Sequence, residues 1–320
     1  MKTLIVGDIH AKHKYILPLV DEALRSTGAG RVVFLGDYCD DWHISDGYML
    51  HNLELFADWA DYKRSKGLAV DVLCGNHDFC YLDNRPGPGT SYRLLESGEI
   101  RSLLLDRLDV RAATVVGGCL CTHAGLTKTW SQRYLGPEPP KSAKDAAAAL
   151  NAMLRDERAG YFWRISRHRG GRHESSSPIW ADMTELLSDA ADGFDQIVGH
   201  TPSDTVKILR GSAGQSLVFA DTMSIESNYH PIGDGSFVLV NDGGDNGESV
   251  NDVGDNDEGV NDEDDNGESI IGDGSFVLVN DGGANDKGDL SVFGLGPEHF
   301  ARFVHAVCDY SLESYARRRD

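Results

Sequence analysis

The sequence predicts an α/β fold built on a parallel sheet. Residues 1–78 read as strand, helix, strand, helix and strand, and strands that alternate with helices are typical of parallel sheets. Five strand-like apolar runs along the chain each end in polar side chains. In open α/β sheets, ligands bind beyond the carboxyl ends of the strands, so five polar strand ends can converge on one site.

The five polar strand ends share one character, because each places Asp, Asn or His directly after the apolar run. They are Gly7-Asp8-Ile9-His10, Gly36-Asp37-Tyr38-Cys39-Asp40, Gly75-Asn76-His77-Asp78, Thr122-His123-Ala124-Gly125 and Gly199-His200-Thr201-Pro202. Asp37 is expected at the centre of the site.

Two helices are expected between the first three strands. The first covers about Tyr15 to Leu24 and has Pro18 in its first turn, where a missing N–H is tolerated. The second runs from about Ser45 to Lys63, with leucines and aromatic residues along one imperfect face.

The middle and the end of the chain predict shorter elements. A loop rich in Pro and Gly at residues 85–90 leads into a short helix and a strand pair near 110–116 and 118–122. Residues 142–158 are rich in strong helix formers. Further strands are expected near 196–199, 206–209, 217–220, 236–240 and 290–293, before a C-terminal helix from about Pro297 to Tyr315.

A repeat interrupts this pattern. The segment Ile232–Gly244 recurs unchanged as Ile271–Gly283, and the decapeptides at 241–250, 251–260 and 261–270 each open with Asn-Asp. Such a repeat buries too little apolar surface to offset its ordering entropy, so residues 241–270 are predicted to form an acidic, disordered insertion. One copy of Gly-Ser-Phe-Val-Leu-Val is enough to complete the sheet, and the sequence leaves open which copy does so.

Calcium binding is a competing interpretation of the repeat. The residues Asp262, Asp264, Asn266, Gly267 and Asp273 fall near EF-hand positions one, three, five, six and twelve. However, position twelve is Asp rather than Glu, position eight is polar, and no helical pattern flanks the loop. The disordered insertion is therefore favoured.

Length and composition are those of a soluble globular protein. With 320 residues and 40% apolar content, the chain can bury a large core, and we expect one domain over residues 1–320 because the candidate site residues run from Asp8 to His200. No apolar run approaches the ~20 residues of a membrane span, and the N-terminal run is too short for a secretory signal. Six cysteines in so long a chain indicate buried thiols rather than disulfides. We expect a cytoplasmic protein with no membrane partner.

The formal net charge of -21 is concentrated in one segment. Residues 241–289 contain 16 Asp and Glu and a single Lys, which leaves -6 for the rest of the chain. The acidity argues against a surface that binds polyanions, so nucleic acid is not an expected partner. A small substrate that contains phosphate remains compatible with it.

The polar strand ends predict two divalent metal ions. Asp8 and His10 put a carboxylate and an imidazole on one side of a strand end, and Asp37 can bridge two metals ~3.5–4 Å apart. Asn76, His123 and His200 would complete the coordination of the second ion. Nitrogen and oxygen ligands without thiolate suit Mn, Fe or Zn better than Mg or Ca, and we place Mn²⁺ first with Fe and Zn as alternatives.

Together, the five motifs resemble the calcineurin-like metallophosphoesterases, and most closely their phosphoprotein phosphatase and diadenosine tetraphosphatase branch. The resemblance covers residues 1 to about 240 and the closing strands and helix. It implies a four-layer αββα sandwich of two mixed sheets flanked by helices. By position it assigns Asp8, His10 and Asp37 to one metal, and Asp37, Asn76, His123 and His200 to the other.

The resemblance also implies a mechanism. A hydroxide that bridges the metals would attack phosphorus in line, while His77 protonates the leaving oxygen and Asp40 orients that imidazole. The substrate would be a phosphomonoester, either a phosphoprotein or a small molecule, or a nucleotide phosphoanhydride. A phosphodiesterase or nuclease of the same superfamily is one alternative, and a non-catalytic scaffold that binds partners is another.

Two motifs depart from the family pattern. Where the protein phosphatases have Gly-Asp-x-x-Asp-Arg-Gly, this chain has Asp41 in place of the arginine that grips phosphate, and the Gly-His-x-His ending of the phosphodiesterases is absent after Gly199. An arginine-dense segment at 163–173 offers a replacement. Arg169 is the candidate, because Arg169-Gly170-Gly171 followed by Pro178-Ile179-Trp180-Ala181-Asp182 resembles the region before the Leu-Trp-Ser-Asp element of the phosphatases; the alternatives are Arg164, Arg167 and Arg172.

Overall fold

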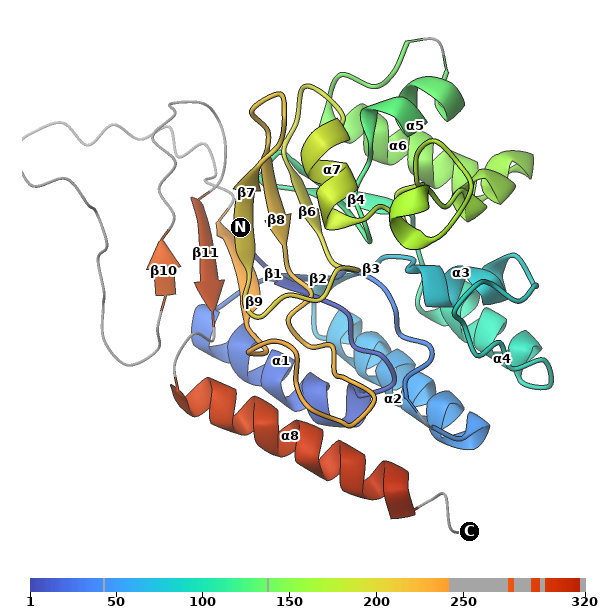
Figure 1. The fold of residues 1–320 in the computed structure, drawn as a ribbon. Helices are drawn as coiled ribbons and strands as arrows, with labels where there is room; N and C mark the ends of the chain where they lie inside the picture. Colours follow the sequence, from blue (N-terminus) through green and yellow to red (C-terminus); the bar gives the residue numbers. More distant parts are fainter. Residues whose placement is uncertain (43, 137, 242–275, 279–288, 294–296, 317–320) are drawn as a thin grey trace, which may run out of the picture.

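Two mixed β-sheets lie face to face at the centre of the fold, with helices on their outer sides (Figure 1). The structure is a computed structural model that describes residues 1–42, 44–136, 138–241, 276–278, 289–293 and 297–316. The layers follow the order helix, sheet, sheet, helix, so the predicted αββα sandwich is confirmed.

The first sheet contains six of the described strands. In spatial order they are β10 (Phe276–Leu278), β11 (Asp289–Phe293), β9 (Phe237–Asn241), β1 (Lys2–Val6), β2 (Arg31–Phe34) and β3 (Ala69–Val72). β1, β2 and β3 are parallel, with Thr3 paired to Arg31 and Arg31 to Ala69. The pairs β1–β9, β9–β11 and β11–β10 are antiparallel. The parallel half brings three of the predicted strand ends to one edge.

The second sheet contains five described strands. Their order is β4 (Ala113–Val116), β5 (Cys119–Thr122), β6 (Gln196–Val198), β8 (Ser216–Phe219) and β7 (Lys207–Arg210). β5, β6 and β8 are parallel, and β4 and β7 are antiparallel edges. β5 and β6 end next to His123 and His200, the two remaining strand ends.

Helices cover both outer faces (Figure 1). On the first sheet lie α1 (His13–Thr27) and α2 (Asp46–Ser65), and α8 (Pro297–Ala316) packs on α1. Beside them, α3 (Asn76–Leu82) packs on α4 (Ser97–Ser102). The π-helical turn Leu103–Arg107 continues α4. On the second sheet lie α5 (Lys128–Tyr134), α6 (Ala143–Leu154) and α7 (Met183–Asp189), and two 3₁₀ helices follow α6, at Glu157–Trp163 and Arg167–Arg169. Within the described part of the chain, no helix is long and apolar enough to cross a membrane.

Alternating side chains along the strands separate the layers. Ile5 of β1 and Val218 of β8 meet in the apolar layer between the sheets. Leu4 faces the opposite way, into the core under α1 and α2, and Phe219 packs with Leu186 of α7. Because successive strand residues point to opposite faces, one short apolar run supplies two cores.

Several predicted boundaries shift. α1 begins at His13, so Pro18 lies inside the helix and not in its first turn. The hydrogen bond that Pro18 cannot make would have gone to the carbonyl of Lys14, an exposed residue that water can reach. α6 starts after the cap Ser142 as expected but ends at Leu154, and Asp156 caps a separate 3₁₀ helix. The short helices α3, α5 and α7 were not predicted.

The cysteine prediction is confirmed in part. All six cysteines are free, but four are buried, Cys119 is half-buried and Cys308 is exposed. Cys119 and Cys121 both pack into the apolar layer between the sheets. Their shared face follows from the two-residue period of β5.

Both copies of the repeat enter the first sheet. β9 comes from the first copy and lies between β1 and β11, whereas β10 comes from the second copy and pairs with the other side of β11. Their registers are the same: Phe237, Val238 and Leu239 pair with Phe293, Val292 and Ser291, and so do Phe276, Val277 and Leu278. Apart from Asn241, the last residue of β9, the predicted insertion at 241–270 lies outside the described residues, as do the calcium-loop positions.

We predict that a chain shortened by one repeat unit keeps its fold. Deletion of residues 242–280 gives the same sequence as deletion of residues 237–275, so either copy can supply the strand between β1 and β11. The melting temperature measured by circular dichroism should change by less than about 5 °C. Deletion of residues 289–293, for which the sequence has no second copy, serves as the control and should abolish the cooperative transition. Loss of that transition in the 39-residue deletion would contradict the prediction.

Candidate metal centre

All six predicted metal ligands lie together at the carboxyl ends of the parallel strands. Ligand atoms of Asp8, His10 and Asp37 lie within 4.8 Å of one another, and so do those of Asp37, His123 and His200. Asp37 belongs to both groups, which is the position that a bridging carboxylate requires.

The second group closes around one imidazole nitrogen. His123 Nε2 lies 3.0 Å from Asn76 Oδ1, 3.1 Å from His200 Nδ1 and 3.4 Å from Asp37 Oδ2. Four atoms with lone pairs thus point at one small volume in a buried region. Such a cluster needs positive charge at its centre, either a proton or a cation.

Backbone carbonyls fix which nitrogen of each ring is available. His10 Nδ1 lies 3.2 Å from the carbonyl of Asp40, and His123 Nδ1 lies 3.0 Å from the carbonyl of Leu35. A carbonyl oxygen can only accept, so Nδ1 carries a proton in both rings, and Nε2 has a free lone pair whenever the ring is neutral. In both rings Nε2 faces Asp37. This is how outer contacts orient ligand histidines in metal sites.

The electrostatics of the cluster suit a cation. Burial opposes ionisation of Asp37, but His123 and then His77 outweigh it and hold the pKa of this carboxyl well below its ordinary value. Burial also opposes the charge of His123, but Asp37 and Asp8 raise the pKa of that imidazole to about 9. Burial lowers the pKa of His10 to about 4 and that of His200 well below its ordinary value. Neutral His10 and His200 rings are the forms that bind metal.

Close backbone contacts explain the glycine that precedes several of these residues. A Cβ added at Gly75 would collide with the carboxylate of Asp37, and one at Gly199 would collide with that of Asp8. The strand ends therefore approach one another more closely than any other residue permits.

Four candidate residues adopt the left-handed backbone conformation that L-residues rarely occupy. Their φ angles are 45° for His10, 56° for Asp37, 64° for Asp40 and 66° for His200. Strain of this kind costs about 1–3 kcal/mol per residue and persists only where the surroundings enforce it. Here it turns the side chains at the strand ends toward one another.

Asp78 enforces the position of Asp37, and the sequence analysis assigned it no role. Its carboxylate is fully buried and accepts four backbone N–H groups, from Asp37 at 2.8 Å, Tyr38 at 2.9 Å, Cys39 at 3.0 Å and Gly75 at 2.9 Å. These bonds tie the loop after β2 to the loop after β3. Burial and then Asp37 raise the pKa of Asp78 to about 6, although its backbone bonds oppose the rise.

His77 and Asp40 form the predicted pair beside this cluster. His77 Nδ1 lies 3.2 Å from Asp40 Oδ2, and the backbone N–H of His77 donates to Asp37 Oδ1 at 2.9 Å. Burial opposes the charge of His77, but Asp37 and Asp40 outweigh it and raise the pKa of the imidazole to about 9. No hydrogen bond within the described residues engages Nε2 of the ring, so that nitrogen can hold a proton toward a substrate.

Arg93 completes the surroundings of Asp40, and no sequence motif pointed to it. Its guanidinium is bonded to Asp40 Oδ1, and the backbone N–H of Ser91 donates to Asp40 Oδ2 at 2.9 Å. Burial alone would raise the pKa of Asp40, but His77 and Arg93 lower it below the ordinary value. Asp40 is thus ionised and held on three sides.

Asp221 is a sixth polar strand end that the sequence analysis did not count. It follows β8 after one residue, is 1% exposed, and accepts a hydrogen bond from Ser224 Oγ at 2.9 Å. Burial and then Asp221 raise the pKa of Asp8 well above its ordinary value. The strand-end rule applied to residues 217–220 could have found this carboxylate.

Among the four candidate arginines, Arg169 lies next to the cluster. Its Nη2 donates to Thr201 Oγ1 at 2.6 Å, and its Nε lies 3.1 Å from Asp182 Oδ2. Thr201 directly follows the candidate ligand His200.

The other three arginines lie elsewhere. Arg164 stacks over the rings of Tyr134 and Tyr161 and contacts His173, while Arg167 and Arg172 are exposed. The geometry therefore separates Arg169 from the three alternatives.

Comparison with known families decides the class of this site. The family model of the calcineurin-like phosphoesterases matches residues 1–229. The chain belongs to the calcineurin-like phosphoesterase family. Members of this family depend on two metal ions, and the two overlapping ligand groups fit that requirement. The resemblance noted in the sequence is confirmed, and the chain is, in general terms, a metal-dependent phosphoesterase.

Two solved structures are similar to this chain. A cold-active protein tyrosine phosphatase shares 19% identity, with 75% of this chain and 74% of that chain covered and a TM-score of 0.46. A candidate diadenosine tetraphosphatase shares 14% identity, with 75% and 88% covered and a TM-score of 0.36. Likenesses of this size do not bear on the substrate. No curated protein sequence matches the chain.

We predict that Asp78→Asn loosens the centre of this phosphoesterase site. The amide nitrogen of Asn would face backbone N–H groups that now donate to a carboxylate, leaving buried donors without partners. Urea unfolding should show a loss of about 3 kcal/mol, and calorimetric titration should show weaker Mn²⁺ binding. Asp58→Asn, at an exposed carboxylate of α2, is the control. Unchanged metal affinity in Asp78→Asn would contradict the positioning role of Asp78.

Proposed function

We propose that this phosphoesterase hydrolyses phosphomonoesters, of a phosphoprotein or a small molecule, or nucleotide phosphoanhydrides, with the help of two divalent ions. The observation that supports this most strongly is the double use of Asp37, which belongs to both groups of ligand atoms. Asp8 and His10 would complete the coordination of one ion, and Asn76, His123 and His200 would complete that of the other. Their nitrogen and oxygen donors favour Mn²⁺, with Fe and Zn as alternatives.

Two bound ions supply an activated water nucleophile and neutralise the charge that develops on the phosphoryl oxygens. The chain contributes by holding its ligands in place before the ions arrive. The carbonyls of Leu35 and Asp40 fix the ring tautomers of His123 and His10, and Asp78 fixes the backbone of Asp37.

His77 acts as the general acid in this proposal. Asp40 binds Nδ1 of the ring, which leaves the Nε2 proton for the leaving oxygen of the substrate. Asp40 also stabilises the charged imidazolium, since it is itself held ionised by Arg93. A proton delivered to the leaving group is worth about 10²–10⁴-fold in rate.

Arg169 binds the phosphoryl group in this proposal. Thr201 and Asp182 hold its guanidinium beside His200, where planar N–H donors can pair with phosphoryl oxygens. It would replace the arginine that the family motif places at the position of Asp41.

The metal requirement and the acid can be tested together. Protein stripped of metal and reloaded with Mn²⁺ should hydrolyse p-nitrophenyl phosphate, a phosphopeptide or diadenosine tetraphosphate. Asp37→Asn should reduce turnover to background because both ions lose a ligand, and His77→Asn should lower kcat by about 10²–10⁴-fold. The control His305→Asn changes a ring that is 78% exposed and should be neutral. Absence of turnover on every substrate, with two ions bound, would favour a binding scaffold instead.

The phosphate contact has its own matched pair of variants. Arg169→Gln should lower kcat/KM for phosphomonoesters by about tenfold to a hundredfold, the equivalent of about 1.4–2.8 kcal/mol, because one charged contact to the phosphoryl group is lost. Arg167→Gln, two residues away and exposed, should have little effect. Equal kinetics for the two variants would exclude Arg169 as the phosphate contact.

A further inference from the structure

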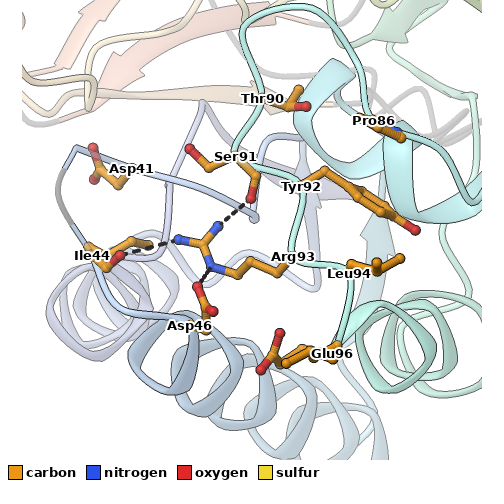
Figure 2. Close-up of a pocket in the computed structure, with 11 residues that line it drawn as sticks. Asp41, Ile44, Asp46, Pro86, Thr90, Ser91, Tyr92, Arg93, Leu94 and Glu96 are labelled. Atoms are coloured by element: carbon orange, nitrogen blue, oxygen red, sulfur yellow. Dashed lines mark hydrogen bonds and ion pairs between the residues drawn. The ribbon is translucent and has the colours of Figure 1, made fainter.

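Arg93 is close to the acid pair, but its guanidinium is already engaged. Its Nε lies 2.8 Å from Asp46 Oδ1, and its Nη2 donates to the carbonyl of Ile44 at 3.3 Å. Its Nη1 binds Asp40 and donates to the carbonyl of Ser91 at 2.9 Å. Figure 2 shows the contacts with Asp46, Ile44 and Ser91. Because Arg93 is also only 6% exposed, it supports Asp40 and is closed off from a substrate.

Arg169 differs because part of its guanidinium is free. Its Nη2 donates to Thr201 Oγ1 and its Nε lies 3.1 Å from Asp182 Oδ2, whereas no hydrogen bond within the described residues engages Nη1. The side chain is 26% exposed. Of the two arginines, Arg169 is the one that can offer a donor to a phosphoryl group, so the contacts that fix its position bear on phosphate binding.

Arg169 is the last residue of a 3₁₀ helix, and Ser166 holds that helix in shape. Ser166 caps the helix, since its hydroxyl accepts from the backbone N–H of His168 at 3.3 Å. The carbonyl of Ser166 accepts from the N–H groups of Arg169 and Gly171, at 3.2 and 2.8 Å. Ser166 therefore fixes the backbone on both sides of Arg169.

Glu185 fixes Ser166, and the proposed mechanism has not used this buried carboxylate. Its Oε2 accepts from Ser166 Oγ at 2.7 Å, and its Oε1 accepts from the backbone N–H of Ser176 at 2.7 Å. Ser176 Oγ accepts from the backbone N–H of Ser166 at 2.9 Å. Glu185 is 3% exposed, and both serines are buried. Since a hydroxyl has one hydrogen, its donation to Glu185 leaves the lone pairs of Ser166 Oγ for the N–H of His168.

The first turn of α7 supports Arg169 at two points. Asp182 caps α7 and lies against Nε of Arg169, and Glu185 follows one helical turn later. The same helical turn thus holds the end of the arginine side chain, through Asp182, and the backbone that carries it, through Glu185 and Ser166.

We propose that Glu185 is a positioning residue for phosphate binding, because it fixes through Ser166 the turn that presents Arg169 to the phosphoryl group. The proposal rests on the phosphate contact proposed above for Arg169. Within the described residues, the hydrogen bonds of Glu185 involve none of the candidate metal ligands. A change at Glu185 therefore weakens phosphate binding and leaves metal binding intact.

Binding of inorganic phosphate to the Mn²⁺-loaded protein, measured by calorimetry, gives the first test. A glutamine amide has one acceptor oxygen, so Glu185→Gln keeps an acceptor for only one of the two serines. This variant should bind phosphate about threefold to tenfold more weakly, with an Mn²⁺ affinity within about twofold of the wild type. Glu174→Gln changes a nearby carboxylate that is 72% exposed and should alter neither affinity. An equal loss of Mn²⁺ affinity in Glu185→Gln would contradict the proposal.

A double-mutant cycle separates positioning from a general structural role. The kcat/KM for p-nitrophenyl phosphate is measured for Glu185→Gln, Arg169→Gln and the double variant. Because Glu185 acts through Arg169, Glu185→Gln should lower kcat/KM by about threefold to tenfold in the wild type and by less than about twofold in Arg169→Gln. Equal factors in both backgrounds would overturn the positioning role and leave the proposed function intact. Absence of turnover in the wild type would overturn the proposed function itself.

Ser166→Ala keeps the proposal testable if Glu185→Gln does not fold, which melting curves reveal. This variant removes the hydroxyl that joins Glu185 to the cap of the 3₁₀ helix and leaves the bond between Glu185 and Ser176 in place. It should lower kcat/KM in the wild type and have little effect in Arg169→Gln. Wild-type kinetics in Ser166→Ala would overturn the proposal.

Discussion

The geometry of the site depends on one buried carboxylate, that of Asp78. It binds backbone N–H groups from two loops that are 36 residues or more apart in sequence, including those of Asp37 and Gly75. Asp37 occupies a strained backbone conformation and would relax without this anchor. Because Asp37 belongs to both groups of ligand atoms, its position decides whether two ions can be held at all. The whole metal centre thus depends on a residue that belongs to neither group of ligand atoms.

Much of the fold and of the candidate site could be predicted, because both follow from short periodic patterns. Apolar runs ending in Asp, Asn or His located the residues around Asp37, since parallel strands bring their carboxyl ends to one edge. The contact between Arg93 and Asp40 could not be found in this way. It joins segments 53 residues apart through a loop without periodicity, and only packing decides it. Asp221 was missed for a different reason. It also follows a predicted strand, so the same strand-end pattern identifies it, but the sequence analysis counted only five strand ends.

The repeat shows a second limit of sequence reasoning. Two identical copies have identical local preferences, so no pattern can choose which one is the inner strand. The choice between β9 and β10 is made by the neighbours: only β9 has β1 on its other side. The sheet accommodates both copies because β11 offers each of its two edges in the same register.

The backbone is left-handed at His10, Asp37, Asp40 and His200. At these positions the residue that would stabilise the fold most differs from the residue that the metal centre and the acid pair require. Glycine or asparagine would adopt these φ angles at lower cost, but either would remove an imidazole or a carboxylate. Directed evolution for heat resistance alone would therefore enrich Gly and Asn at these four sites and erase the centre while improving the scaffold. A thermostable library of this protein needs a selection for metal retention beside the one for melting temperature.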